Sequence, residues 1–136
     1  MQNVPPSQIA KSSTGLDENV AALLAYIMTW ITGLVFFFIE KSSRLVRFHA
    51  MQAILLGATA AVVGLVLWFG WIIFAVGGAM ISDVLPGLIS LVFGLLLFVF
   101  WIGILIAWIM CLIKAYQGQY FKLPLLGNFA EKFSAR

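Results

Sequence analysis

The chain has 136 residues, of which 63% are apolar and only 10% are charged. Water-soluble domains are typically about 45–50% apolar and about 25% charged, so this composition excludes an ordinary soluble fold and predicts a single all-α membrane unit. The formal net charge of +3 is modest. Its distribution along the chain is therefore more informative than its sum, and no nucleic-acid partner is expected.

The first 15 residues, MQNVPPSQIAKSSTG, are polar and rich in Pro, Ser and Gln. They lack the apolar core of a signal peptide, and we expect residues 1–15 to form a disordered tail. Residues 16–136 then make up one membrane domain.

Residues 20–39 form the first uncharged apolar run. A bilayer core about 30 Å thick requires about 20 apolar residues in a helix, so this run predicts one membrane span. Asp17, Glu18 and Asn19 precede it and favour a helix N-terminus through capping and the helix dipole.

The next run, from Phe48 to Ser82, is too long for one untilted span and too short for two. We therefore expect the second span at about 50–75 and the third at about 88–113, ending before Lys114. Glycine and proline interrupt regular structure, and the connection is marked by Gly77, Gly78, Asp83, Pro86 and Gly87.

Three spans would place the 40–47 loop and the C-terminal tail on one side of the membrane. That side would hold Lys41, Arg44, Arg47, Lys114, Lys122, Lys132 and Arg136. The other side would hold Lys11, Asp17, Glu18 and Asp83. The positive-inside rule then predicts a multi-pass protein of the cell membrane with its N-terminus outside and its C-terminus in the cytoplasm.

Each predicted span carries small residues at four-residue spacing, such as Ala25, Thr29 and Gly33 in the first. Such residues let helices approach closely in a bilayer. They favour packing within a three-helix bundle, and a homodimer seam is the alternative.

Residues 114–133 follow the third span and combine aromatic, basic and helix-breaking residues. Leu126, Phe129 and Phe133 fall at helical spacing after Pro124. This pattern predicts a short amphipathic helix at the membrane surface, as an anchor or as a docking surface for a partner.

The stretch RLVRFHAMQAILLG, residues 44–57, begins the second span. His49 and Gln52 are three residues apart and share one helix face, which we expect to point toward the other helices. The predicted polar packing cluster consists of Glu40, Arg47, His49, Gln52 and Gln117. Contacts with anionic lipid headgroups are expected from Lys41, Arg44, Arg47, Lys114 and Lys122.

Alternatives for this stretch are recognition of a ligand or lipid headgroup, and proton transfer or catalysis by His49. No Ser-His-Asp order, carboxylate pair or phosphate loop accompanies it. One histidine and one cysteine do not supply the several ligands of a metal site. We therefore expect no catalytic residues, no metal and no cofactor.

Three stretches carry a resemblance to a known family: LDENVAALLAYIMTWITGLVFFFIEK, RLVRFHAMQAILL and IKAYQGQYFKLPLLGNFAEKF. The chain resembles the Tic-twenty-like group of small prokaryotic membrane proteins, related to the import component of the chloroplast inner envelope. In the chloroplast proteins the residue matching His49 is commonly Asn, which implies a need for polarity rather than titration. Those proteins have four spans. A few relatives resemble magnetosome membrane proteins, which implies roles in membrane organisation.

Two functions are therefore compatible with the sequence. The first is a non-enzymatic scaffold, or an accessory factor of assembly or translocation, with a membrane-protein partner or as a homo-oligomer. The alternative is a subunit of an oligomeric transporter or channel. Its polar lining would have to come from Thr29, Thr32, Gln52, Thr59 and Ser90.

Overall fold

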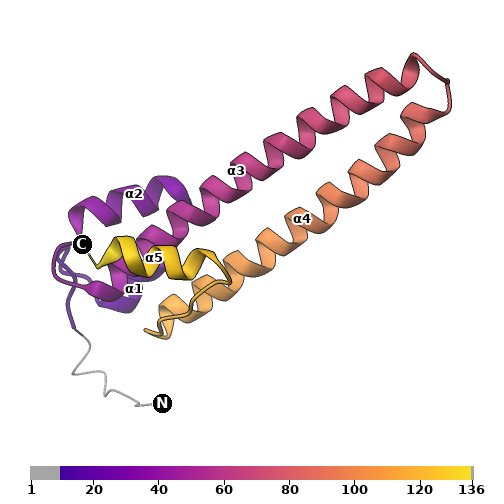
Figure 1. Ribbon diagram of the computed structural model, residues 1–136. Helices are drawn as coiled ribbons and strands as arrows, with labels where there is room; N and C mark the ends of the chain where they lie inside the picture. Colours follow the sequence, from indigo (N-terminus) through magenta and orange to yellow (C-terminus); the bar gives the residue numbers. More distant parts are fainter. Residues whose placement is uncertain (1–9, 136) are drawn as a thin grey trace. The chain divides into compact units, whose positions relative to one another are not determined.

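The computed structural model describes residues 10–135, and the described residues are helical apart from turns, loops and one isolated bridge. This confirms the all-α class. The helices are α1 (Glu18–Leu24), α2 (Trp30–Ile39), α3 (Arg44–Ala79), α4 (Leu85–Tyr116) and α5 (Leu126–Ser134) (Figure 1). They form two compact units: the first comprises residues 10–57 and 107–135, and the second comprises residues 58–106.

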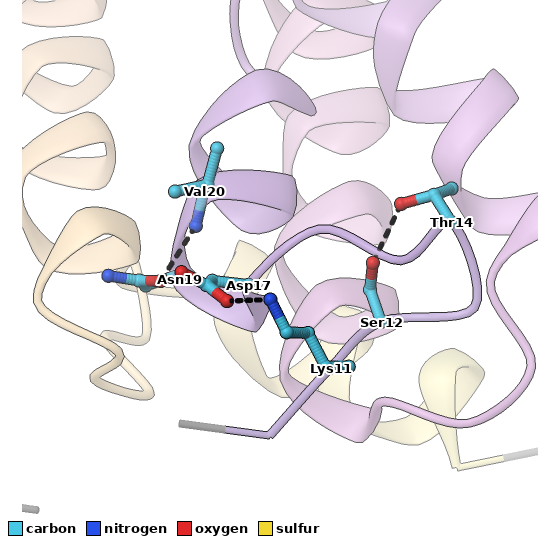
Figure 2. A network of polar contacts seen from close by, with 6 residues as sticks. All are labelled: Lys11, Ser12, Thr14, Asp17, Asn19 and Val20. Atoms are coloured by element: carbon cyan, nitrogen blue, oxygen red, sulfur yellow. Dashed lines mark hydrogen bonds and ion pairs between the residues drawn. The ribbon is translucent and has the colours of Figure 1, made fainter. Parts of the chain in front are cut away.

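Residues 10–17 fold into a tight loop ahead of α1. The amide of Ser12 donates to the carbonyl of Leu16 at 2.8 Å. The ammonium of Lys11 lies 2.7 Å from a carboxylate oxygen of Asp17, and this ion pair is drawn in Figure 2. Residues 10–15 are therefore folded, in contrast to the expected disordered tail. Residues 1–9 of that tail lie outside the described residues.

The predicted span at 20–39 is not one helix, because residues 25–29 form turns between α1 and α2. The hydroxyl of Thr32 donates to the carbonyl of Ala25 at 2.9 Å and accepts the amide of Met28 at 3.1 Å. A side chain that bonds the backbone in this way competes with helical hydrogen bonding. Thr29 has φ +46°, outside the helical region, and the continuous-helix prediction is corrected accordingly.

α3 and α4 are both longer than predicted, because they extend beyond 50–75 and 88–113 at each end. At 1.5 Å per residue, the 36 residues of α3 measure about 54 Å. Only residues 80–84 connect the two helices. Pro86 is accommodated in the first turn of α4, where a backbone N–H has no helical partner.

The second unit is a hairpin made by the adjoining parts of α3 and α4. A Cβ atom added to Gly70 would lie 3.2 Å from the ring of Phe93, so the two helices approach closely there. The indole of Trp71 donates to the hydroxyl of Ser90 at 2.9 Å. A Cβ atom at Gly94 would meet nothing within 4 Å, so this small residue of the predicted stripes lies away from the seam.

In the first unit, α2 packs against the beginning of α3. A Cβ atom added to Gly33 would lie 2.9 Å from the carbonyl oxygen of Ala50, and one added to Gly57 would lie 2.9 Å from the side chain of Trp30. The small residues therefore let the two helices touch. The core of this unit includes Ala21, Ala22, Ala25, Tyr26, Leu45, Val46, Phe48, Ala50, Ala53 and Leu56.

After α4 the chain turns at Gly118, whose φ of +68° is the left-handed conformation that glycine adopts without strain. Residues 119–123 then run without helix to α5. The short helix expected after Pro124 is α5, Leu126–Ser134, whereas residues 114–116 of the predicted interfacial segment 114–133 belong to α4.

Candidate functional site

The most polar buried position in the first unit lies on the first turns of α3. His49 and Gln52 are three residues apart on this helix and share one face, as expected. Both side chains are completely buried. A buried polar group is costly unless it is hydrogen-bonded, so the partners of these two side chains define what the position can do.

Both ring nitrogens of His49 are engaged. Nε2 lies 2.9 Å from the carbonyl oxygen of Gln119, which can only accept, so Nε2 carries a hydrogen. Nδ1 lies 3.1 Å from the hydroxyl of Tyr26. In the neutral ring the hydroxyl of Tyr26 therefore donates to Nδ1, and His49 has no nitrogen left for a substrate.

Gln52 continues the same chain of hydrogen bonds. Its Nε2 donates to the Tyr26 hydroxyl at 3.1 Å and to the carbonyl oxygen of Phe121 at 3.0 Å. Its Oε1 accepts the amide of Leu123 at 3.2 Å. Nε2 also lies 3.4 Å from the sulfur of Cys111, so both ends of the amide are used.

His49 and Gln52 together bind one backbone edge of the segment after α4. Their backbone partners come from residues 119, 121 and 123, which are alternate positions, as on one edge of an extended strand. We call Tyr26, His49 and Gln52 the clamp. It supplies hydrogen bonds that an extended segment without a neighbouring strand would otherwise lack.

Further bonds connect the clamp to the other elements of the first unit. The indole of Trp108, on α4, donates to the carbonyl of Tyr26 at 2.8 Å. The side-chain amide of Asn19, at the start of α1, donates to the carbonyl of Tyr116 at 3.1 Å. The turn after α1, the start of α3 and the end of α4 are therefore joined by side-chain hydrogen bonds.

Glu40 forms a separate site between α2 and α3. Its carboxylate accepts the amides of Ser13, Ser42 and Ser43 at 2.8 to 3.1 Å, and the hydroxyls of Ser13 and Ser42 at 2.8 and 2.9 Å. Desolvation alone would raise the pKa of Glu40. The hydrogen bonds have the larger effect, and they lower the pKa from its ordinary value of 4.5 to about 2. The site also brings Ser13, before α1, against the end of α2.

The five residues of the predicted polar cluster are thus only partly together. His49 and Gln52 meet through Tyr26, whereas Glu40 binds the three serines around it. The guanidinium of Arg47 lies 5.1 Å from the ring centre of Phe37, and its buried Nε has no hydrogen-bond partner among the described residues. Gln117 is exposed, with its Oε1 3.4 Å from the ammonium of Lys114.

The residues expected at lipid headgroups differ in how freely they can reach them. Lys41 and Arg44 are exposed, and Arg47 is half-buried. Lys114 is half-buried and donates to the Gln119 side chain at 3.1 Å. Lys122 is exposed but paired with Glu131 at 2.6 Å, an exposed ion pair that contributes little to stability. Arg136 lies outside the described residues.

Sequence reasoning missed Tyr26, Trp108 and the backbone of residues 119–123. The one available signal was that Tyr26 and Trp108 carry polar atoms inside apolar runs, and such atoms need partners when buried. The backbone groups have no signature in the sequence, because every residue carries them.

The chain is similar to a family of known proteins over most of its length. The model of the magnetosome magnetite crystal formation protein family matches residues 16–130. A UPF0132 membrane protein of Methanocaldococcus jannaschii is 37% identical over 129 residues, which cover 93% of this chain and 96% of that protein. One from Archaeoglobus fulgidus is 36% identical over 117 residues, covering 86% and 95%. No solved structure matches.

These matches correct the family expected from the sequence. The resemblance to the Tic-twenty-like group is wrong, because the family model and the archaeal relatives assign the same stretches elsewhere. Any role in protein import that this resemblance implied is therefore withdrawn.

Proposed function

The chain belongs to the magnetosome magnetite crystal formation protein family, and from this premise we propose that it is a non-enzymatic membrane scaffold. The observation that carries the proposal is the clamp. Every nitrogen and oxygen of the His49 and Gln52 side chains is used on the chain itself. The polar groups hold the fold together, and the remaining surface is largely apolar.

The second unit has the properties of a membrane-spanning hairpin. Between residues 58 and 106 the only charged residue is Asp83. Both long helices are long and apolar enough to cross a membrane. α3 has 36 residues and α4 has 32, about 54 and 48 Å at 1.5 Å per residue, so each exceeds a hydrocarbon core of about 30 Å. Many large apolar side chains of this unit face outward, as lipid contact requires.

The contacts of Glu40 support a topology with two spans in place of three. Ser13 precedes α1 and Glu40 follows α2, yet the carboxylate of Glu40 accepts the amide of Ser13 at 2.9 Å. A segment whose two ends meet enters and leaves the membrane on the same face. In the proposed topology α1 and α2 form a re-entrant hairpin, and the N- and C-terminal segments share one side.

Charge supports placing that side in the cytoplasm. All eight lysines and arginines of the sequence lie outside residues 58–106. An excess of basic residues beside membrane spans favours the cytoplasmic side. The proposal keeps the C-terminus inside and moves the N-terminus from outside to inside.

The alternative of a channel subunit gains little from the side chains considered for its lining. Gln52 belongs to the clamp, the hydroxyl of Thr32 bonds the turn before α2, and Ser90 accepts the indole of Trp71. These polar groups are occupied within the chain. A catalytic use of His49 would first require breaking one of its two hydrogen bonds.

The topology is tested by labelling single cysteines with a membrane-impermeant maleimide in sealed vesicles of known orientation. Cys111 is replaced by alanine, and cysteine is then introduced at Thr14, Asp83 or Lys132, which are all exposed. We expect Thr14→Cys and Lys132→Cys to react from one side and Asp83→Cys from the other. Reaction of Thr14→Cys together with Asp83→Cys would restore three spans.

The scaffold itself is tested by crosslinking in native membranes, followed by purification of the intact chain. We expect discrete adducts with a membrane-protein partner or with further copies. Conductance of ions by the purified protein in liposomes, without adducts in native membranes, would overturn the scaffold in favour of the channel.

A further inference from the structure

The turn between α1 and α2 has backbone groups arranged for an environment without water. All five amides of residues 25–29 donate within the chain: four to carbonyls and that of Met28 to the Thr32 hydroxyl. Ile27 and Met28 nevertheless point outward, with exposed fractions of 54% and 56%. Non-helical backbone at membrane depth must be satisfied by protein groups, and exposed apolar side chains at such a turn suit lipid tails.

The outer face of α2 continues this apolar surface. Its ten residues measure about 15 Å, half of a hydrocarbon core of about 30 Å. One side of the helix packs on α3 through Gly33, so the bulky residues are left outside. Those exposed are Trp30, Ile31, Leu34, Val35, Phe38 and Ile39.

α5 has the same arrangement on a smaller scale. Its small residues Gly127 and Ala130 are buried against the unit, and a Cβ atom at Gly127 would lie 2.5 Å from the Cβ atom of Lys122. Phe129 and Phe133, one turn apart, stay exposed. Helices with an exposed apolar stripe and basic neighbours lie in the membrane interface.

We propose that the α1–α2 hairpin and the apolar stripe of α5 insert into the lipid of the cytoplasmic leaflet alone, so that the protein prefers membranes convex toward the cytoplasm. This rests on the topology given under the proposed function. In that topology α3 and α4 cross both leaflets, while α2 and α5 add volume to only one. Insertion into one leaflet expands it relative to the other, and such binding is sensitive to curvature.

Charge identifies lipid as the occupant of these faces. Lys41 and Arg44 are exposed directly after α2, and Lys132 is exposed on α5. Basic residues at the edge of an apolar face complement an anionic leaflet. A second copy of this chain would instead bring these like charges together.

The test uses the full-length protein, labelled with a fluorophore, in giant vesicles that contain phosphatidylglycerol. Narrow tubules are pulled from vesicles in which the termini face outward, as verified by maleimide labelling of the single-cysteine variants. We expect the protein to be enriched on tubules over the flat membrane by at least about twofold relative to a lipid dye. Equal density on both membranes would overturn the proposal even where the labelling supports the topology.

Matched variants test whether the enrichment on tubules depends on the exposed rings of α2 and α5 or on exposed apolar side chains anywhere in the protein. The double variant Phe38→Ala with Phe129→Ala removes two exposed rings from the first unit. The double variant Phe69→Ala with Phe98→Ala removes two comparably exposed rings from the second unit. We expect the first pair to abolish the enrichment and the second to preserve it. Equal loss in both pairs would contradict the proposal. Dimers crosslinked through a cysteine at Phe38 would also overturn it, because a second copy would then cover α2.

Discussion

The two units of the chain solve the hydrogen-bonding problem of an apolar environment in different ways. The second unit consists of two continuous helices, which satisfy their own backbone groups, and it needs little beyond glycine-to-aromatic packing and the bond from Trp71 to Ser90. The first unit contains a helix break and an extended segment. It requires Thr32, Trp108 and the clamp to satisfy the backbone that these irregular parts leave free.

The largest difference between the units is expected from removing a clamp residue. Gln52→Leu leaves the carbonyl of Phe121 and the amide of Leu123 buried without partners. An unpaired buried group costs about 1–3 kcal/mol, so the free energy of unfolding should fall by about 4 kcal/mol in reversible denaturation in detergent. Trp71→Phe is the control in the second unit, with an expected loss of about 1 kcal/mol. Equal losses would mean that the two units depend on polar bonds alike.

Lowering the pH should have the next largest effect on stability, and this effect should arise in the first unit. Because the pKa of Glu40 is lowered to about 2, its contribution to stability is complete above the ordinary value of 4.5 and is lost as the pH falls through 2. That shift corresponds to about 3 kcal/mol. Thermal unfolding followed between pH 5 and 2 should show a drop that is absent in Glu40→Gln.

Glu40→Gln should also be less stable than the wild type at neutral pH, because an amide cannot accept all five serine hydrogen bonds. Asp83→Asn, at the exposed carboxylate of the second unit, should retain the acid dependence of the wild type. A wild-type profile that is flat over this range would refute the contribution of the ionised Glu40 carboxylate to stability.

Glycine substitutions should give the smallest effects, with opposite signs. Gly33→Ala would force a methyl group to 2.9 Å from the Ala50 carbonyl, and overpacking costs about 1–3 kcal/mol. Gly94→Ala meets nothing within 4 Å and should stabilise its helix by about 0.5–1 kcal/mol. Melting temperatures in one detergent compare the two, and loss of stability in both would contradict the separation of seam and outer face.

Periodicity and composition were enough to predict the regular parts of this fold. The two long helices and the shared face of His49 and Gln52 are predictable, because apolar length and helical spacing are local properties. The break at residues 25–29 is not, because residues 20–39 are uniformly apolar and the break depends on where the hydroxyl of Thr32 bonds. Local hydrogen bonding of this kind overrides the apolar pattern.

The error over Gln117 has a similar cause. Gln117 and Gln119 both lie near the end of α4. The left-handed turn at Gly118 directs the chain back toward α3, so Gln119 reaches His49 while Gln117, which precedes the turn, does not. The clamp then binds the backbone of Gln119, whose side chain bonds Lys114 instead. Choosing between the two glutamines required the conformation of one glycine.

The span of sequence that the clamp closes has a consequence for biosynthesis. Gln52 binds Phe121 and Leu123, which leave the ribosome 69 and 71 residues later. Until then, its amide and the ring of His49 have no partners from residues 119–123. Two buried side chains of α3 therefore stay without these partners until the last part of the chain has been made. The hydrogen bonds of the first unit are thus completed only after synthesis of the second unit has finished.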